Sequence, residues 1–487
     1  MSTTKFDSTS TRSGTICRWS ALAFGLALTA GRAHAQGAPT TEAAPTEPPP
    51  PAGTAPATPP PQSEVQSNPL AEQQLEQIRK MVSAMPKVFE YDGYFRSGTG
   101  LNAKGGHQDP FGAPGAPAKY RLGNETETYG EVGLTANWLN PEHNDTWFKS
   151  KIKIAYVAPR NQTFDVMSNI AYREAFVEAG HVLESHPEAS FWAGQRFYRR
   201  RDVHINDFFF NDMSGYGAGF QDLKVGEKVK LNVAYLGGTN LPSAADPGPV
   251  SGLGRLYKST VDIRVSDIPV GSGNLELWLI PTLAAKGDST LNNRSGIGGG
   301  LFWFVPMLGG SNELSASFGY GGAANLSTAV DTSIASSGWL LRVVDRATVQ
   351  LSPQLSMMWG GVFQLDNRNG STNGSGGTMW ASAGVRPVFM LGKYTGVAVE
   401  GGVDVVKPEA PDGTSVDTIA LGKLTVAGVI RPGMDFFSRP ELRVFVTGAA
   451  WNNGAKVAQN PTNPIGGFGS AGDNAGLTAG VQAETWW

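Results

Sequence analysis

The stretch Phe197–Gly219 holds the densest mixture of charged and aromatic side chains in the sequence (FYRRRDVHINDFFFNDMSGYGAG). Three consecutive arginines, residues 199–201, come before three aspartates, and three consecutive phenylalanines, residues 208–210, lie between the last two aspartates. Neither helical nor strand periodicity explains this order. Surface loops rarely carry three phenylalanines in a row, and packed cores rarely carry so many charges. The mixture therefore indicates a narrow, wet passage in which charges bind polar groups and rings offer flat apolar faces. A surface loop with aromatic anchors is the alternative.

Two carboxylates this close in sequence could also serve as the acid and base of glycoside hydrolysis. Asp202 and Asp207 form the candidate pair, but we expect the three arginines to keep both ionised. No carboxyl would then have the raised pKa that a general acid needs. His204 has no serine or cysteine nucleophile motif and no metal-ligand spacing around it. The sequence therefore predicts no enzyme, no metal site and no cofactor.

The first 35 residues predict a secretory signal peptide. Basic residues near the start are followed by an apolar run over residues 21–30 and by the small-x-small site Ala33-His34-Ala35. The apolar run is shorter than the ~20 residues that a membrane-spanning helix needs. Cleavage before Gln36 would remove the only cysteine, Cys17, so we expect an exported protein without disulfides.

The next two segments differ sharply in composition. Residues 36–68 are rich in Pro, Ala, Thr and Glu and predict an extended linker. Within residues 69–87, apolar side chains recur at steps of 4, 3, 4 and 3 and form a seam: Ala71, Leu75, Ile78, Val82 and Met85. We interpret this segment as a short coiled coil that associates when it is tethered to an oligomer. An amphipathic helix that lies on the rest of the chain is the alternative.

Residues 88–487 alternate in polarity within short segments that Gly, Asn, Asp and Pro interrupt. In residues 88–96, for example, the apolar rings of Phe89, Tyr91 and Phe95 share one face, and Glu90, Asp92, Tyr94 and Arg96 share the other. The same alternation recurs in residues 127–136, 149–156, 261–265, 441–446 and 477–486. One apolar face and one charged face predict an all-β transmembrane antiparallel barrel with a polar lumen. A soluble β-sandwich is the alternative, although the terminal Trp486-Trp487 favours a membrane interface.

Several motifs in this region resemble the maltoporin (glycoporin) family of outer-membrane sugar porins. They are YFRSG from Tyr94, KYRLGNETETYGE from Lys119, WAGQRFYRRRDVH from Trp192, SGYGAG from Ser214, SRPELRVFVT from Ser438, and the terminal pair of tryptophans. The resemblance spans residues 88–487 and is loose over residues 220–335. The segment before residue 88 resembles the N-terminal extension of sucrose porins.

The resemblance implies a homotrimer of barrels in outer-membrane lipid, each of about 18 strands. It implies that the stretch Phe197–Gly219 folds inward and narrows the pore, and that maltodextrins or other oligosaccharides move along a slide of aromatic rings between polar tracks. The slide positions are Tyr94, Tyr129, Phe164, Phe209 and Trp486. A slide tryptophan expected after Arg386-Pro387 is replaced near Leu391. The polar-track positions are Arg96, Arg121, Glu131, Arg173, Arg200, Asp202 and Asp207.

Two other functions fit parts of the sequence. A general diffusion porin would need the barrel without the slide. An envelope-tethering protein would act through residues 69–87, which could contact the periplasm or cell wall. The formal net charge of −3 gives no sign of a nucleic-acid partner.

Overall fold

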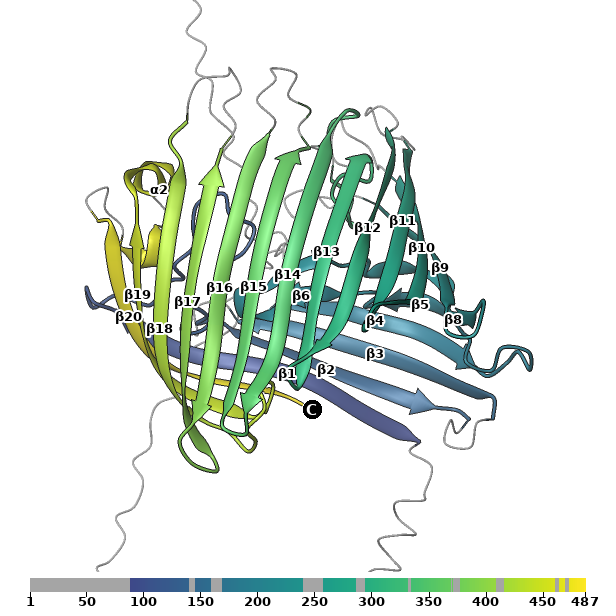
Figure 1. Cartoon of the computed structure of the whole chain (residues 1–487), viewed down its shortest axis with the longest axis horizontal. Helices are drawn as coiled ribbons and strands as arrows, with labels where there is room; N and C mark the ends of the chain where they lie inside the picture. The colour runs from purple at the N-terminus through teal and green to yellow at the C-terminus, as the bar shows by residue number, and fades with distance from the viewer. Residues whose placement is uncertain are drawn as a thin grey trace, which may run out of the picture. The chain divides into compact units, whose positions relative to one another are not determined.

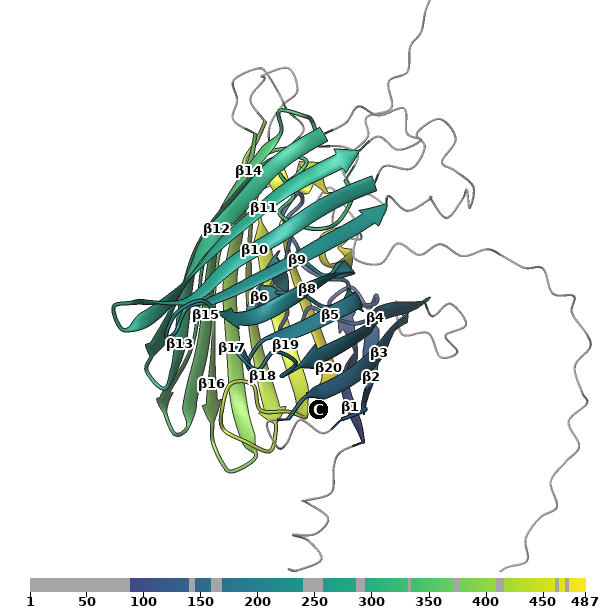
Figure 2. The same cartoon turned by 90° about the vertical axis from the view of Figure 1, so that its right-hand side faces the viewer.

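The computed structural model describes residues 88–139, 145–158, 169–239, 257–285, 294–331, 334–368, 370, 377–408, 416–459, 464–468 and 473–487. The predicted signal peptide, linker and coiled coil lie outside the described residues, and so does Phe164. Along the described residues, eighteen strands form one antiparallel sheet (Figures 1 and 2). The sheet is closed, because each of its strands pairs with the next and the last strand, β20, pairs with the first, β1. The predicted all-β barrel is confirmed.

The barrel strands are β1 (Phe89–Asn102), β2 (Thr128–Asn137), β3 (Trp147–Ala158), β4 (Asn169–Gly180), β5 (Ser190–Arg196), β8 (Gly215–Lys224), β9 (Lys230–Thr239), β10 (Tyr257–Val270), β11 (Gly273–Ala285), β12 (Arg294–Met307), β13 (Gly310–Gly321), β14 (Trp339–Ser352), β15 (Leu355–Asn367), β16 (Thr378–Met390), β17 (Thr395–Lys407), β18 (Ile419–Ile430), β19 (Glu441–Trp451) and β20 (Ala475–Trp486). Between β5 and β8 lie β6 (Arg201–Val203), the 3-10 turn η2 (His204–Asn206) and β7 (Phe208–Asn211), and between β19 and β20 lie α2 (Asn453–Ala458) and η3 (Ile465–Gly467). No helix in the described ranges is long and apolar enough to cross a membrane.

The alternating sequence pattern places side chains as predicted. On β1, the rings of Phe89, Tyr91 and Phe95 are exposed on the outer face, whereas Tyr94 and Arg96 face the interior. On β19, outward Leu442 and Val444 are exposed and Arg443 between them is buried. An apolar outer face suits contact with lipid.

The interior is not uniformly polar, which corrects the expectation of a charged inner face throughout. Trp380 on β16, Val344 on β14 and Met358 on β15 are buried on the inner face and belong to one apolar cluster. The cluster also contains residues from the connection between β5 and β8; the ring centroid of Phe208, for instance, lies 4.9 Å from that of Trp380. An apolar core therefore forms inside the barrel, where connections cover the wall.

Several of the described connections fold inward, and we name three of them inner loop A (residues 103–127), inner loop B (197–214) and inner loop C (322–338, described without 332–333). The hairpin β6–β7 of inner loop B lies within the ring of strands in both views (Figures 1 and 2). Arg121 of loop A donates its backbone N–H to the carbonyl oxygen of Ile205 in loop B at 2.9 Å. Asp212 of loop B pairs in a parallel bridge with Ser327 of loop C. The three loops therefore support one another.

Arginines of the barrel wall hold inner loop B in place. Arg342 Nη1 donates to the Phe210 carbonyl oxygen at 2.6 Å, and Arg346 Nη1 donates to the Asp202 carbonyl oxygen at 2.6 Å. Arg264 Nη2 donates to Asn211 Oδ1 at 3.1 Å. Hydrogen bonds from a charged donor are among the strong ones. The loop is thus fixed by strands β10 and β14, which lie in or beside the loosely matched part of the sequence.

Gly360 on β15 gives a test of how tightly inner loop B fits the wall. A Cβ atom at this glycine would lie 2.2 Å from Val203 Cγ1, and Val203 is fully buried in the loop. Gly360→Ala should displace the loop, cost about 1–3 kcal/mol of stability as overpacking does, and change single-channel conductance. Gly361→Ala is the matched control, because the nearest atom to its Cβ would be 3.9 Å away. Native conductance and heat resistance in Gly360→Ala would contradict the close packing.

Candidate functional site

Three of the predicted slide residues form a row on the inner wall. Tyr129, Tyr94 and Trp486 come from the adjacent strands β2, β1 and β20, and Tyr94 is directly opposite Trp486 in the register. The Tyr94 ring centroid lies 5.9 Å from that of Tyr129 and 6.4 Å from that of Trp486, and the Tyr94 and Trp486 planes differ by 16°. All three side chains are half-buried. They form a continuous aromatic surface, which we call the aromatic row.

Phe209 is not part of this row. It projects from inner loop B and is 40% exposed, whereas its neighbours Phe208 and Phe210 are buried against the wall. Its ring centroid lies 4.1 Å from Arg200 Cζ, and the same guanidinium carbon lies 4.1 Å from the ring centroid of Phe197. Arg200 is therefore sandwiched between two rings, with one face of Phe209 covered.

Charged groups converge on the hydroxyl of Tyr94. Arg121 Nη2 and Arg96 Nη1 donate to it at 3.0 and 3.3 Å, and the hydroxyl donates to Glu484 Oε1 at 3.0 Å. Both arginines also pair with Glu125, at 2.9 Å from Arg121 Nε and 3.5 Å from Arg96 Nη1. Burial alone would raise the pKa of the Glu125 carboxyl, but Arg121 and Arg96 outweigh burial and lower it to about 2. Glu125 is therefore ionised at any physiological pH.

Glu131 and Arg173 lie on the Tyr129 side of the row. The Tyr129 hydroxyl donates a hydrogen bond to Glu131 Oε1. Arg173 Nε lies 3.9 Å from the same oxygen atom, and Arg173 Cζ lies 4.9 Å from the ring centroid of Phe197. These contacts connect the row at Tyr129 to the start of inner loop B.

The arginines at 199–201 do not pair with Asp202 or Asp207, which corrects the sequence expectation. Arg200 Nε pairs with Asp212 Oδ2 at 3.1 Å, and Arg201 Nη2 pairs with Glu276 Oε2 at 3.0 Å. Arg199 donates to Asn232 on the wall. These partners lie on the wall and elsewhere in loop B, so neighbours in sequence turn away from one another in the fold.

Asp202 and Asp207 lie in different surroundings. Asp202 Oδ1 lies 3.8 Å from Arg346 Nη1, and Asp202 Oδ2 lies 3.9 Å from His204 Nδ1. Asp207 follows η2 with a left-handed φ of 56° and takes part in no ion pair among the described residues. The two carboxylates that we expected the arginines to keep ionised are therefore separate sites.

Sequence reasoning did not assign His204 a role, yet it lies beside the row. Its ring meets Trp486 edge-on at 6.1 Å between centroids, and Arg121 Nη1 donates to its Nδ1 at 3.3 Å. Burial and then the nearby Arg121 charge hold the pKa of His204 well below its ordinary value, so the ring is neutral. The position of His204 could be predicted only together with the path of inner loop B.

Glu484 and Arg439 were also missed. Arg439 Nη2 pairs with Glu484 Oε2 at 2.8 Å, and Arg439 Cζ lies 4.2 Å from the Trp486 ring centroid. Glu484 could have been found, because it shares the inward parity of Trp486 on β20. Arg439 lies in a connection without periodicity, so no comparable signal marked it.

The chain is similar, at low sequence identity, to several solved structures. The outer membrane channel DcaP of Acinetobacter baumannii has 12% identity and a TM-score of 0.45, with 82% of this chain and 97% of that chain covered. OccD3 of Pseudomonas aeruginosa has 8% identity and a TM-score of 0.44, with 83% and 92% covered. OprB of Pseudomonas putida has 9% identity and a TM-score of 0.41, with 85% and 97% covered.

The decisive comparison is with protein families. The model of the LamB porin family matches residues 89–487, which include every barrel strand and the aromatic row. A match over this much of the chain shows the family. The chain belongs to the LamB porins, and is an outer-membrane channel protein.

Proposed function

We propose that this porin conducts maltodextrins or related oligosaccharides along the aromatic row. The row is the observation that carries the proposal, since Tyr129, Tyr94 and Trp486 present contiguous rings on the inner wall. A pyranose has apolar C–H patches that stack on aromatic faces, and hydroxyls that need partners once they lose water. Rings alone would bind the sugar poorly, because they leave its hydroxyls without hydrogen-bond partners. The charged groups at the ring edges supply those partners.

The row also suits transport rather than tight binding. Its ring centroids are separated by similar distances, 5.9 and 6.4 Å, so a sugar moving one step meets a similar environment. Neighbouring sites of similar, weak affinity let a solute enter a channel and leave it again. The geometry therefore favours guided diffusion.

The predicted polar-track residues differ in how much of each side chain is exposed. The side chains of Arg173, Arg200 and Asp202 are 24%, 24% and 29% exposed and can reach a sugar hydroxyl. The Arg121 side chain is only 7% exposed. We assign Arg121 the role of positioning the Tyr94 hydroxyl. We assign Arg173, Arg200 and Asp202 to contact with the sugar. Phe209, opposite Arg200, would narrow the pore without offering a hydroxyl.

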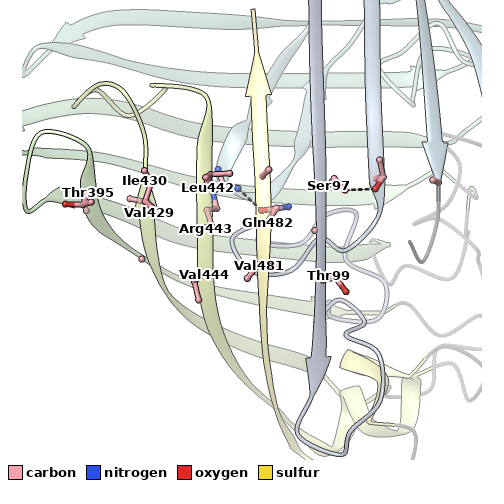
Figure 3. Close-up of a pocket in the computed structure, with 16 residues that line it drawn as sticks. Ser97, Thr99, Thr395, Val429, Ile430, Leu442, Arg443, Val444, Val481 and Gln482 are labelled. Atoms are coloured by element: carbon pink, nitrogen blue, oxygen red, sulfur yellow. Dashed lines mark hydrogen bonds between the residues drawn. The ribbon is translucent and has the colours of Figure 1, made fainter. Parts of the chain in front are cut away.

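We infer a homotrimer, as the family resemblance implies, and place a subunit contact on the outer face of strands β17–β20 and β1–β3. A hollow of about 1100 Å³ lies there, with Ser97, Thr99, Leu442, Val444 and Val481 around it (Figure 3). Small and hydroxyl-bearing side chains form much of its lining, and the Ser97 and Thr128 hydroxyls pair at 2.7 Å. A hollow with hydroxyl groups suits a packed protein surface better than fluid lipid.

The segments before residue 88 stay predictions. We propose that residues 1–35 are a cleaved signal peptide, that residues 36–68 are an extended linker, and that residues 69–87 form a trimeric coiled coil on the periplasmic side. Three such helices tethered to joined barrels would have a high effective concentration.

Planar-bilayer recordings test the sugar path. Maltodextrins or sucrose-like sugars should block the ion current of the wild-type channel saturably. Alanine at Tyr94, Tyr129 or Trp486 should weaken this block about two- to ten-fold, because one stacked ring contributes ~0.5–1.5 kcal/mol. Tyr91→Ala is the control, since Tyr91 is 75% exposed on the outer face of β1. A wild-type current that high sugar concentrations leave unaffected would identify a general diffusion porin instead.

Glu125 should stabilise inner loop A in a pH-dependent way. Its folded pKa of about 2 lies below the ordinary value of 4.5, so its contribution is present above pH 4.5 and lost as the pH falls toward 2. Glu125→Gln should cost about 1–3 kcal/mol at pH 7, and the difference from wild type should shrink below pH 4.5. Denaturant unfolding followed by tryptophan fluorescence measures the loss of stability at pH 7 and the smaller difference below pH 4.5.

Glu127→Gln is the matched control for Glu125→Gln. Glu127 also pairs with Arg96, but its side chain is 29% exposed, so solvent weakens the pair and the loss should be smaller. Equal losses of unfolding free energy in the two variants would contradict the role of Glu125 in stabilising inner loop A. A Glu125→Gln loss that stays the same down to pH 2 would also contradict it.

Removal of residues 1–87 tests the N-terminal segments. Exported behind an unrelated signal peptide, residues 88–487 should still form trimers on gels and conduct, because barrel contacts dominate, but should lose any periplasmic attachment that the arm provides. A shortened chain that forms no trimers would make the arm an assembly nucleus. A peptide of residues 66–90 on a trimeric carrier should be helical by circular dichroism, and an unstructured peptide would refute the coiled coil.

A further inference from the structure

Lys258 is a buried lysine that the proposed sugar path does not use. It lies on β10 with the same inward parity as Arg264, and it is only 3% exposed. Its ammonium group donates to Asn325 Oδ1 at 2.8 Å, to the Ser327 carbonyl oxygen at 2.8 Å and to the Ala329 carbonyl oxygen at 3.3 Å. An ammonium group has three donors. Inner loop C therefore supplies an acceptor for each of them.

The charge of Lys258 is balanced by these oxygen atoms and not by a paired carboxylate. Asp331 is the acid whose charge acts on Lys258 within the described residues, but its own ion pair is with Arg368, at 3.9 Å between Asp331 Oδ2 and Arg368 Nη1. A buried ammonium that loses its hydrogen-bond partners is costly. Loop C could not leave the wall without stranding this charge, so the lysine and the loop hold each other in place.

Loop C folds back across the inner wall to reach Lys258. It leaves the barrel after β13, and β10 is three strands away in the sheet. Two wall glycines let it approach closely, since a Cβ atom at Gly296 or Gly319 would lie 2.3 Å from Ala323 N or 2.4 Å from Ala323 O. Leu326, buried in the apolar cluster, has a left-handed φ of 52°. The loop is therefore fitted to the wall along its way to Lys258.

The turn that receives the ammonium group is ordered by its own hydrogen bonds. Asn325 Nδ2 donates to the Ala329 carbonyl oxygen at 2.7 Å, and Ala329 N donates to Ser327 Oγ at 3.2 Å. The three acceptors of Lys258 thus converge on one point. A compact ammonium suits such a site, whereas the planar fork of an arginine does not.

The residue that Lys258 binds is also the one that pairs with inner loop B. Ser327, whose carbonyl oxygen accepts from Lys258, forms the parallel bridge with Asp212. The next residue, Thr328, donates its hydroxyl to the Ser214 carbonyl oxygen. The wall arginines bind loop B at earlier residues. Loop C therefore adds the contacts that hold the end of loop B.

Asp212 connects this contact to the passage. Its carboxylate pairs with Arg200 Nε at 3.1 Å, and the Arg200 guanidinium lies against the exposed ring of Phe209. We propose that Lys258 is a positioning residue that fixes loop C and, through it, holds Arg200 and Phe209 in one place in the channel. The proposal rests on the proposed function, in which Arg200 contacts the sugar and Phe209 narrows the pore.

Single-channel recordings test the proposal. Lys258→Met keeps the apolar stem and removes the donors. It should raise the open-channel current and its noise, because Phe209 can then move away from the passage. It should also weaken sugar block about two- to ten-fold, the range for one stacked ring. Thr328→Val, which loses the bond to Ser214 but keeps Lys258, should shift the current in the same direction.

Thr260→Val is the matched control. Thr260 is the next inward residue on β10 and is equally buried, but its hydroxyl pairs with that of Thr282 within the wall, at 3.1 Å. This variant removes a buried hydrogen bond from the same strand without touching loop C. It should leave the current, its noise and sugar block unchanged.

Two further measurements separate positioning from a general loss of stability. In a Phe209→Ala channel the ring is already gone, so Lys258→Met should change the current less there than in the wild type. Lys258→Ala leaves room for a small ammonium ion. Propylammonium in the bath should reduce the excess noise of this variant, and tetramethylammonium, which has no N–H donor, should not.

The outcomes distinguish this proposal from the proposed function. Native current and noise in both Lys258→Met and Thr328→Val, beside a changed current in Phe209→Ala, would overturn the role of Lys258 alone. An equal effect of Lys258→Met in both backgrounds would also overturn it. A native current in Phe209→Ala would overturn the narrowing by Phe209 and this proposal with it. Absence of sugar block in the wild type would overturn the sugar path only. If Lys258→Met gives no folded channel, Thr328→Val decides.

Discussion

The structure depends on closure of the sheet between β1 and β20. In a bilayer, the polar backbone groups of an open edge would have no partner, so a membrane-spanning sheet has to close. Closure pairs the first strand with the last and brings Tyr94 opposite Trp486 and Arg96 opposite Glu484. The same register that satisfies the backbone places two rings of the row 6.4 Å apart. The site is therefore a consequence of closure, and a slip of β20 by one residue against β1 would turn Trp486 toward the lipid.

A closed sheet of eighteen strands leaves an interior too wide for wall side chains alone to fill. The inner loops fill it, and buried charges bind their backbones. Lys423 Nζ donates to the Leu122 carbonyl oxygen at 2.6 Å, and the Leu122 N–H donates to Glu400 Oε1 at 3.0 Å. Lys423 and Glu400 also pair with each other at 2.8 Å. A buried charge that lost its partners would be costly, so the wall and loop A constrain each other.

Local alternation was enough to predict six of the strands and their faces, since the period of two is a property of each strand by itself. The number of strands came from the family resemblance. Alternation put Tyr94, Tyr129 and Trp486 on the inner face, and the family resemblance singled them out from the other inward residues. Alternation could not predict which groups Arg199, Arg200 and Arg201 bind. Those partners depend on where inner loop B crosses the wall, a contact between segments far apart in sequence.

Arg439 escaped prediction for a related reason, because a connection has no period from which a face can be read. The difference between strand residues and loop residues has a consequence for sugar specificity. The spacing of the rings on β1, β2 and β20 is set by strand register and is expensive to change, whereas Arg121, Arg200, Asp202 and Phe209 belong to inner loops. Loop substitutions can alter the polar groups and the width of the path without disturbing closure. We therefore expect the wall to determine that sugars stack here, and the loops to determine which sugars pass.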